Sequence, residues 1–250
     1  MRSIDIVVVH PELMGTYGDG GNAEVLAHRA RLAGAEASIL LVAHTDPLPD
    51  DADVYCIGGG EDVAQIACVS ALRGRDAQTL AAAMARGAQV LAICAGLQIL
   101  GDVFPGSQGE PVEGLSLIPV TTHRGAERLI GEIAMTSAIT GTTLTGFENH
   151  RGVTELRAGA SPLGVMTLGN GNGIAGVDGI VTDHVIGTYM HGPALARNPE
   201  LADIILSRVG VDTAGIRDDA ATAFATERRT VAAAMASKRA RRLGRGTWQW

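Results

Sequence analysis

The sequence predicts an α/β protein with a flavodoxin-like, doubly wound and mostly parallel sheet, helices on both faces, and a second half rich in β-hairpins. Three observations lead to this fold class. Short, continuously apolar and β-branched runs alternate with helical segments in the first hundred residues, as in strands buried on both faces of a parallel sheet. Helices between such strands indicate right-handed crossovers. Only eight of the 250 residues are aromatic, and a core of small aliphatic residues suits helices packed on that sheet.

The elements are expected in an alternating order. Apolar runs predict strands at 4–9, 37–42, 54–57 and 89–93. Helical patterns are expected at 22–33, 76–86, 199–209 and 220–242. Asn22 can cap the first of these helices, and Gly244 is expected to end the last. Between 102 and 189 the chain changes to Gly/Thr-rich alternating segments with Asn-Gly pairs at 170–173, which favour β-hairpins.

The charge is divided unevenly along the chain. The formal net charge is −7, and an acidic balance argues against nucleic acid as the main partner. Residues 227–250 contain seven basic residues and one acidic residue, a net charge of +6, so the first 226 residues carry −13. This tail is interpreted as a solvated helix whose basic end complements the helix dipole, or as a segment that docks an acidic partner or a membrane surface through Trp248 and Trp250.

Cysteine usage and hydropathy indicate the compartment. The chain has three cysteines, begins without a secretion signal and contains no run of 18 apolar residues. We therefore expect reduced thiols and a cytoplasmic protein. The basic tail leaves association with the inner face of the membrane open.

Cys94 points most clearly to chemistry. It ends an apolar strand and begins a turn into a helix, with Ala92 and Gly96 two residues to either side. A nucleophile on a sharp strand-to-helix turn needs such small neighbours, because the turn packs against adjacent strands. The helix N-terminus would favour the thiolate and could hold an oxyanion. We expect Cys94 to be a nucleophile, and Cys56 and Cys68 to fill core space.

A base for this thiol is expected at His191, which follows an apolar strand at the edge where open α/β folds place their sites. From position alone, a solvated loop histidine is an equally good interpretation, since the chain has six other histidines. Glycines 58–60 also end a strand. Their N–H groups could face an oxyanion opposite Cys94 or form an ordinary tight turn.

The sequence contains no convincing nucleotide-binding or zinc-binding motif. Gly171, Gly173 and Gly176 form a G-x-G-x-x-G pattern, but the Asn-Gly pairs indicate hairpin turns and no amphipathic helix follows. A nucleotide site there is rejected. The sequence has no phosphate-binding P-loop and no Cys/His spacing typical of zinc. We expect no metal and no other cofactor in this chain.

Several motifs together resemble one enzyme class. The elbow Ala-x-Cys94-x-Gly-x-Gln98, the earlier glycine cluster and the later His191 resemble the class I glutamine amidotransferases. Further similarity to the cobyric-acid-synthase-like branch, and within it to the GatD-type glutaminase subunits of lipid II isoglutaminyl synthase, lies at 17–22, 58–65, 128–132 and 191–199. The resemblance implies an amidotransferase domain over 1–210 and leaves 211–250 as an Ala/Arg-rich helical extension.

The resemblance implies roles for individual residues. Cys94 would attack the side-chain amide of L-glutamine, His191 would carry the proton, and a glutamyl thioester would form. The N–H of Ala95 and one from Gly59 or Gly60 would hold the oxyanion.

The substrate would be held by two further residues. Arg128 matches the family's glutamine-binding arginine, and Gln98 would lie near the bound substrate. Without the resemblance, Arg128 would be interpreted as a surface arginine.

One position departs from the broader class. Many class I enzymes orient the catalytic histidine with a glutamate two residues later, where this chain has Pro193. The orienting carboxylate could be Asp19, Glu148 or an acidic residue of a partner chain; alternatively, Cys94 and His191 act as a dyad.

The resemblance also implies a partner. A useful glutaminase passes ammonia directly to an activated acceptor, and this chain has no ATP-binding loop with which to make one. The family's partner is a Mur-ligase-like subunit, forming a heterodimer, that would use ATP and Mg²⁺ to amidate the D-glutamate α-carboxylate of a lipid-linked peptidoglycan precursor to D-isoglutamine.

Three alternatives stay open from the sequence. The acceptor could be another compound, such as a corrinoid carboxylate. The chain could be a non-catalytic flavodoxin-like binding module. It could also be a hydrolase or stress protein with an elbow cysteine on a similar fold.

Overall fold

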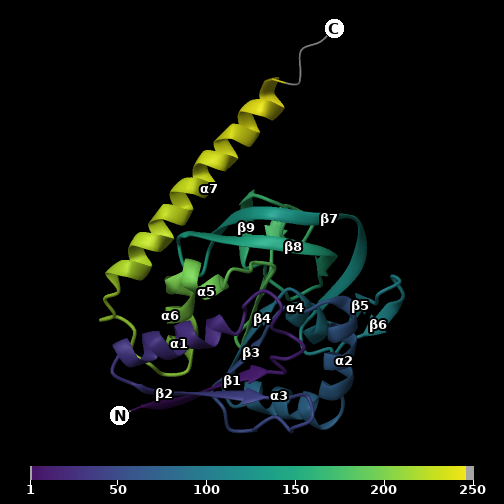
Figure 1. Cartoon of the computed structure of the whole chain (residues 1–250), viewed down its shortest axis with the longest axis vertical. Helices are drawn as coiled ribbons and strands as arrows, with labels where there is room; N and C mark the ends of the chain where they lie inside the picture. The colour runs from purple at the N-terminus through teal and green to yellow at the C-terminus, as the bar shows by residue number, and fades with distance from the viewer. Residues whose placement is uncertain (1, 246–250) are drawn as a thin grey trace.

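A computed structural model describes residues 2–245, with side chains as far as Arg241. Trp248 and Trp250 of the predicted tail lie outside the described residues. Two β-sheets with flanking helices form the body, and one long helix leaves it (Figure 1). Among the described residues, no helix is both long enough and apolar enough to cross a membrane.

The first sheet confirms the predicted doubly wound arrangement. Its strand order is β11-β12-β4-β3-β1-β2, and all neighbours are parallel except β11 and β12. The strands are β1 Ser3–Val9, β2 Glu36–Val42, β3 Val54–Ile57, β4 Gln89–Ile93, β11 Ile180–Val181 and β12 Val185–Thr188. The central strands β3, β4 and β12 are buried along their whole length, as their continuous apolar sequences predict.

Helices lie on both sides of this sheet (Figure 1). On one side α1 packs against α5 and α6, and on the other α2 packs against α3 and α4. Their bounds are α1 Gly21–Leu32, α2 Asp62–Leu72, α3 Arg75–Ala85, α4 Ala95–Leu100, α5 Ala194–Arg197 and α6 Pro199–Arg208.

Two details of the helices differ from the sequence-based expectations. Asn22 does not cap α1: Gly20 holds that position, and the buried Asn22 side chain instead accepts the N–H of Leu195 at 2.9 Å. Helix α2 was not anticipated. Its sequence is almost uniformly apolar, so it lacks the polar face that marks an amphipathic helix.

The second half is β-rich, as predicted, but it forms a sheet of its own. The order is β10-β9-β7-β5-β6, with β8 paired to β7. The strands are β5 Val103–Pro105, β6 Pro111–Glu113, β7 Val120–Ser137, β8 Thr143–Leu156, β9 Gly164–Leu168 and β10 Val177–Asp178. The long β7–β8 hairpin has a register shift between Arg124 and Leu129, which bulges the strand.

The predicted C-terminal helix is present as α7, Asp219–Arg245, and passes Gly244 by one residue. Ala225 and Ala232 on one face of it are buried. The helix contacts α5, α6 and strands β7–β9 near its start and then projects away from the body (Figure 1).

The core depends on the central strands. Leu91 of β4 is fully buried, whereas Leu41 of β2 is 65% exposed. We expect Leu91→Ala to lower the free energy of unfolding by about 2–5 kcal/mol, because it leaves a cavity in close-packed surroundings. Leu41→Ala, the control, should change it by less than about 1 kcal/mol. Urea titration would measure both, and equal losses would contradict this account of the core.

Candidate active site

The strand-to-helix turn expected at Cys94 is present. Strand β4 ends at Ile93, α4 begins at Ala95, and Cys94 between them has φ 52° and ψ −103°. A non-glycine residue with positive φ is strained and is retained mainly where the surroundings demand it. A Cβ at Gly96 would lie 2.5 Å from the carbonyl oxygen of Ile57. A side chain at position 96 would therefore collide with the backbone of β3, which is why this position needs glycine.

His191 lies beyond the end of β12 and is held from both sides. Its backbone exchanges two hydrogen bonds with Phe147 of β8, 2.9 and 3.2 Å long. Its side chain is buried, and Nδ1 donates to Oδ2 of Asp19 at 3.0 Å. Asp19 is also buried and belongs to the loop between β1 and α1. Of the carboxylates considered from the sequence, Asp19 is the one that contacts His191.

Gly59 completes this arrangement. Its N–H donates to Asp19 Oδ2 at 2.8 Å. A Cβ at Gly59 would lie 2.6 Å from Cε1 of His191 and 3.2 Å from Oδ2 of Asp19. The absence of a side chain is therefore what lets the carboxylate and the imidazole meet. Because the Gly59 N–H is used by Asp19, Gly60 is the better placed of the two for an oxyanion.

The pKa of His191 reflects these neighbours. Burial alone lowers it, but the hydrogen bond to Asp19 and the adjacent Cys94 thiol outweigh burial and raise the pKa to about 10. Within the described chain, Nε2 of His191 has no hydrogen-bond partner. The imidazole is thus fixed through Nδ1 and keeps its other nitrogen for proton transfer.

The other two cysteines are core residues, as predicted. Cys56 and Cys68 are buried, and burial raises the pKa of each thiol to about 12. Neither thiol ionises readily at neutral pH, in keeping with a packing role.

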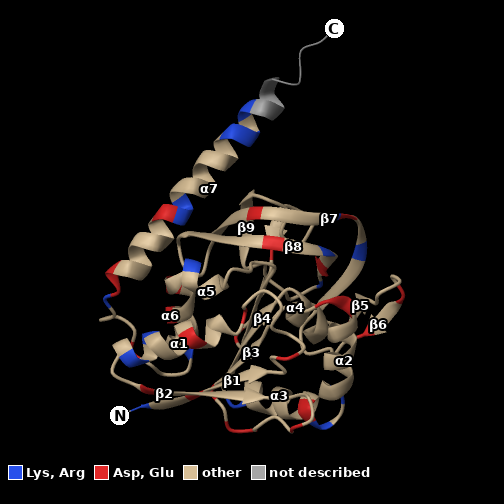
Figure 2. Ribbon diagram, in the orientation of Figure 1, with Lys and Arg blue, Asp and Glu red and all other residues tan. Residues whose placement is uncertain are grey.

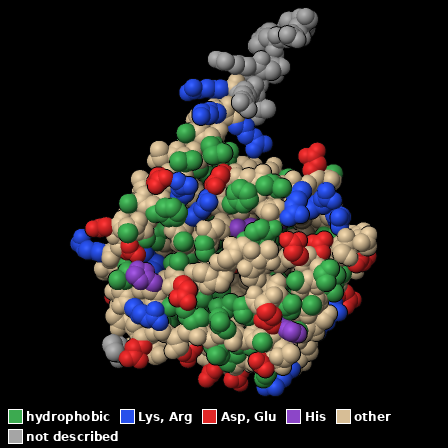
Figure 3. Space-filling model, viewed as in Figure 1, with side chains coloured by type: hydrophobic (Ala, Val, Ile, Leu, Met, Phe, Trp, Pro, Cys, Tyr) green, Lys and Arg blue, Asp and Glu red, His purple; other side chains and the backbone are tan. Residues whose placement is uncertain are grey.

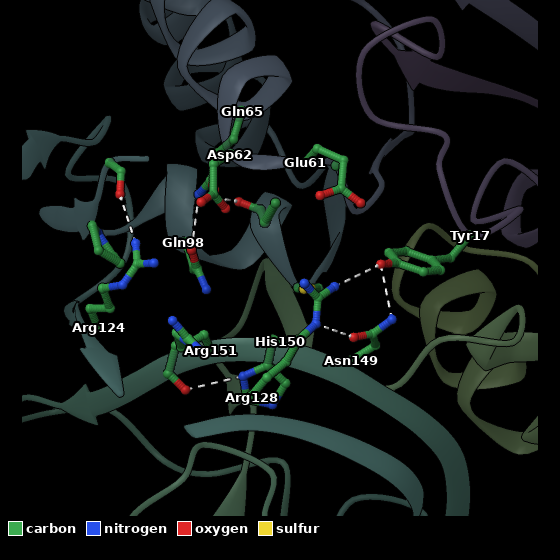
Figure 4. Close-up of a pocket in the computed structure, with 16 residues that line it drawn as sticks. Tyr17, Glu61, Asp62, Gln65, Gln98, Arg124, Arg128, Asn149, His150 and Arg151 are labelled. Carbon is green, nitrogen blue, oxygen red and sulfur yellow. Dashed lines mark hydrogen bonds between the residues drawn. The ribbon is translucent and has the colours of Figure 1, made fainter. Parts of the chain in front are cut away.

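A cavity of about 230 Å³ opens over Cys94, bordered by Gly60 and Ala95 on the side of the first sheet. On the other side Arg128, Tyr17 and Asn149 form a connected group (Figure 4). Arg128 Nε donates to Asn149 Oδ1 at 2.7 Å. The Tyr17 hydroxyl accepts from Asn149 Nδ2 at 3.1 Å and from an Arg128 terminal nitrogen at 3.4 Å. The bulge in β7 thus carries an arginine that is already oriented into the cavity.

Tyr17 links this group to His191. Its ring lies 4.5 Å from the His191 ring, measured between centroids, while its hydroxyl holds Asn149 and Arg128. One residue therefore contacts both the proton-transfer side and the arginine side of the cavity.

Gln98 also lines the cavity, on α4 directly after the elbow. Its amide nitrogen donates to the Tyr189 hydroxyl at 2.9 Å, and its amide oxygen accepts from Gln65 at 3.0 Å. These bonds fix the side chain beside Cys94.

Side chains of both charge signs surround the cavity (Figure 4). The cations are Arg124, Arg128 and Arg151, and the anions are Glu61 and Asp62. A small cavity with both signs suits a ligand that carries a carboxylate and an ammonium group. Residues 2–245 contain no cluster of three His, Cys, Asp or Glu side chains placed to hold a metal ion.

Glu148, the other internal candidate for orienting His191, is used elsewhere. Its carboxylate accepts from the backbone and side-chain nitrogens of Asn170 and from the backbone of Gly171, at 2.8–3.3 Å. The glycine pattern at 171–176 lies in the loop that joins the antiparallel strands β9 and β10, as the predicted hairpin requires, and Gly171 donates to the Glu148 carboxylate.

The structure therefore brings together every site residue expected from the sequence. They are Cys94, His191, Arg128, Gln98, Gly60 and Ala95. Tyr17 and Asn149 were not assigned roles. Tyr17 lies in the segment 17–22, which resembles the family. Nothing near Asn149 in the sequence marks it, because its position depends on the pairing of β8 with β7.

Comparison with known proteins supplies the family. Residues 5–199 match the CobB/CobQ-like glutamine amidotransferase domain. The chain belongs to this family. It is 35% identical to the lipid II isoglutaminyl synthase subunit GatD of Streptococcus pneumoniae, over 80% of this chain and 77% of that protein. It is 32% identical to GatD of Staphylococcus aureus, over 83% and 85%.

More distant relatives agree. A cobyric acid synthase of Sphingopyxis alaskensis is 33% identical over 69% of this chain but only 35% of its own length. Among solved structures, a glutamine amidotransferase matches with TM-score 0.57 and 17% identity over 82% of this chain and 99% of that one. Another, from Thermotoga maritima, matches with TM-score 0.53 and 14% identity over 95% and 96%. At these identities the structures confirm the fold alone.

Membership of the glutamine amidotransferase family makes this protein a glutamine-hydrolysing enzyme. An enzyme of that kind needs a nucleophile, a proton carrier and a carboxylate-binding cation. Cys94 and Arg128 line the cavity, and His191 lies beside Cys94, so residues of all three types are present at this place.

The contact between Gly59 and His191 predicts a specific effect. Gly59→Ala places a methyl group against the imidazole, so we expect kcat for glutamine hydrolysis to fall roughly 10- to 100-fold through misplacement of His191. Gly20→Ala is the matched control, because a Cβ there meets nothing within 4 Å. Ammonia release by both purified variants would be measured; equal rates would show that the imidazole tolerates the methyl group.

The Asp19 hydrogen bond predicts a shift in the pH profile. Asp19 raises the pKa of His191, so Asp19→Asn should lower that pKa and move the alkaline limb of kcat/KM to lower pH. We also expect kcat to fall by roughly 10²-fold or more. Asp50→Asn, the same change on an exposed loop, is the control. An unmoved alkaline limb in Asp19→Asn would rule out this role.

Proposed function

We propose that this protein is the glutaminase subunit of a lipid II isoglutaminyl synthase. The observation that carries the proposal is its similarity to two GatD subunits at 35% and 32% identity, over 77% and 85% of their lengths. The match extends over most of each relative. The geometry around Cys94 supports the chemistry.

In the proposed reaction, Nε2 of His191 already holds the proton taken from the Cys94 thiol, because its raised pKa keeps the imidazole protonated at neutral pH. The thiolate attacks the side-chain amide carbon of glutamine, and the N–H groups of Ala95 and Gly60 stabilise the oxyanion. The carbon–nitrogen bond then breaks as the imidazolium gives its proton to the leaving nitrogen, which departs as ammonia. Water hydrolyses the thioester to glutamate and restores the thiol. Asp19 stabilises this imidazolium until its proton is given to the leaving nitrogen.

The same cavity would select glutamine. The Arg128 guanidinium, held by Asn149 and Tyr17, would bind the α-carboxylate. Glu61 and Asp62 line the opposite side and would attract the α-ammonium group. These contacts would place the side-chain amide toward Cys94 and Gln98.

The ammonia would go to a Mur-ligase-like synthetase subunit in a cytoplasmic heterodimer. That subunit would use ATP and Mg²⁺ to activate the D-glutamate α-carboxylate of the lipid-linked peptidoglycan precursor, giving D-isoglutamine. Because Asp19 already contacts His191, the proposal does not need a partner carboxylate for the histidine.

A second candidate is amidation of a corrinoid carboxylate, since cobyric acid synthases also match. The chain spans only about a third of those proteins, whereas it spans most of each GatD subunit. A non-catalytic binding module is disfavoured by the strained Cys94 turn and the His191–Asp19 contact, for which simple binding has no use.

Cys94→Ser tests the glutaminase role. With the synthetase subunit, ATP, Mg²⁺ and a lipid-linked muropeptide, we expect the variant to lose glutamine-dependent amidation by roughly 10³-fold or more. Ammonium chloride should restore amidation, because the synthetase half is intact. Mass spectrometry of the stem peptide would locate the new amide. Amidation from glutamine by Cys94→Ser would overturn the mechanism, and amidation of a corrinoid instead would overturn the acceptor.

A further inference from the structure

Helix α7 has one face packed on the body and another that is not. The packed face contains Ala225, Arg229, Ala232 and Ala236. Ala225 and Ala232 are buried, and Ala232 packs against Ala134 and Leu168. Arg229 donates to the carbonyl oxygen of Thr143 at 2.8 Å and to Glu200 at 2.7 Å. This face fixes the direction of the helix relative to β8.

A second row of side chains runs along the outside of α7. We call it the outer stripe: Phe224, Arg228, Val231, Met235 and Lys238. Their spacing alternates between four and three residues, which places them on one face of a helix. Phe224, Val231 and Met235 are 39–41% exposed, and the Arg228 guanidinium lies 5.5 Å over the Phe224 ring. The three apolar side chains of this stripe are therefore partly exposed to solvent.

Beyond Ala236 the helix becomes strongly basic (Figure 2). This segment, residues 237–245, is called the basic arm. It contains Lys238, Arg239, Arg241, Arg242 and Arg245, and no acidic residue follows Glu227 in the sequence. Lys238, Arg239 and Arg241 are exposed. Figure 3 shows apolar side chains on α7 near the body and basic ones farther out.

We propose that the outer stripe and the basic arm dock an acidic, elongated surface of the synthetase subunit. Naming that subunit as the occupant rests on the proposed function. An apolar seam with alternating four- and three-residue spacing suits a partner helix or groove. The exposed cations Lys238, Arg239 and Arg241 farther along suit a partner that is acidic at that end.

The position of α7 suits the same partner. Arg229 fixes the helix to Thr143 at the start of β8, and Asn149 of the cavity lies six residues along that strand. Six residues of β-strand span about 20 Å. Helix α7 itself is about 40 Å long. A subunit that receives ammonia near the cavity can therefore reach the outer stripe as well.

A membrane surface fits the helix less well. A helix that lies in a bilayer interface has a broad apolar face along its length, with cations beside that face. Here the apolar stripe is narrow, Arg228 interrupts it, Lys238 ends it, and an adjacent face is already packed on the body. The stripe is shaped for a protein contact.

The test compares two charge-reversed full-length chains. The arm variant is K238E/R239E/R241E, and its control is R75E/R86E/R217E, three exposed arginines on the body. Each changes the formal net charge from −7 to −13, so a general charge effect would appear in both. We expect the arm variant to bind the purified synthetase subunit at least about 10-fold more weakly at 0.1 M salt, and the control within about 2-fold of wild type.

A second variant tests the apolar part of the stripe. V231S/M235S should weaken binding by roughly 3-fold or more, since it removes exposed apolar area at the seam. Glutamine hydrolysis by each isolated variant should equal wild type, which separates this proposal from the proposed function. If the wild-type protein did not hydrolyse glutamine, the proposed function itself would be wrong. Intact hydrolysis with unchanged synthetase binding in both variants would defeat the docking proposal.

Three other outcomes would also overturn it. The first is equal weakening by the arm variant and its control. The second is binding of wild type, but not of the arm variant, to phosphatidylglycerol vesicles while synthetase affinity is unchanged, which would assign the arm to a membrane. The third is a wild-type homodimer that the arm variant dissociates, which would assign it to a second copy of this chain.

Discussion

The buried carboxylate of Asp19 is the interaction on which the site depends. It accepts hydrogen bonds from the Gly59 backbone and the His191 ring, and so connects the loop after β1, the end of β3 and the segment after β12. These three segments are far apart in sequence and meet only because parallel strands end at one edge of the sheet. A buried carboxylate requires compensating partners, and here those partners are the groups that the chemistry needs in place.

Much of the first sheet and the turn at Cys94 could be predicted, because both depend on residues that are neighbours in the sequence. Continuous apolar runs gave β1, β3 and β4, and small residues around Cys94 indicated the turn. The second sheet was harder: alternation and Asn-Gly pairs indicate hairpins but do not reveal that β7 and β8 pair with each other apart from the parallel sheet. Helix α2 escaped detection because its exposed face also carries apolar residues such as Val63, so the sequence lacks the polar face by which helices are recognised.

The residues of the site also differ in how far the sequence could predict them. Cys94 and His191 could be inferred from strand ends, and Arg128 only from family resemblance. The choice between Asp19 and Glu148 could not be made from sequence, because both are acidic residues near glycine-rich loops, and only the tertiary pairing decides which one reaches the histidine. Asn149 and the bond it makes to Arg128 depend on a β-bulge, a feature without a reliable sequence signature.

The backbone pairing of His191 with Phe147 joins the two sheets at the reaction centre. Phe147 lies two residues before Asn149 on the same strand. The hairpin that orients the arginine and the segment that carries the imidazole are therefore one mechanical unit. A shift of β8 along its axis would move Asn149, which holds Arg128, and Phe147, which holds His191, together. In the proposed mechanism, such a shift would therefore alter substrate affinity and turnover at the same time.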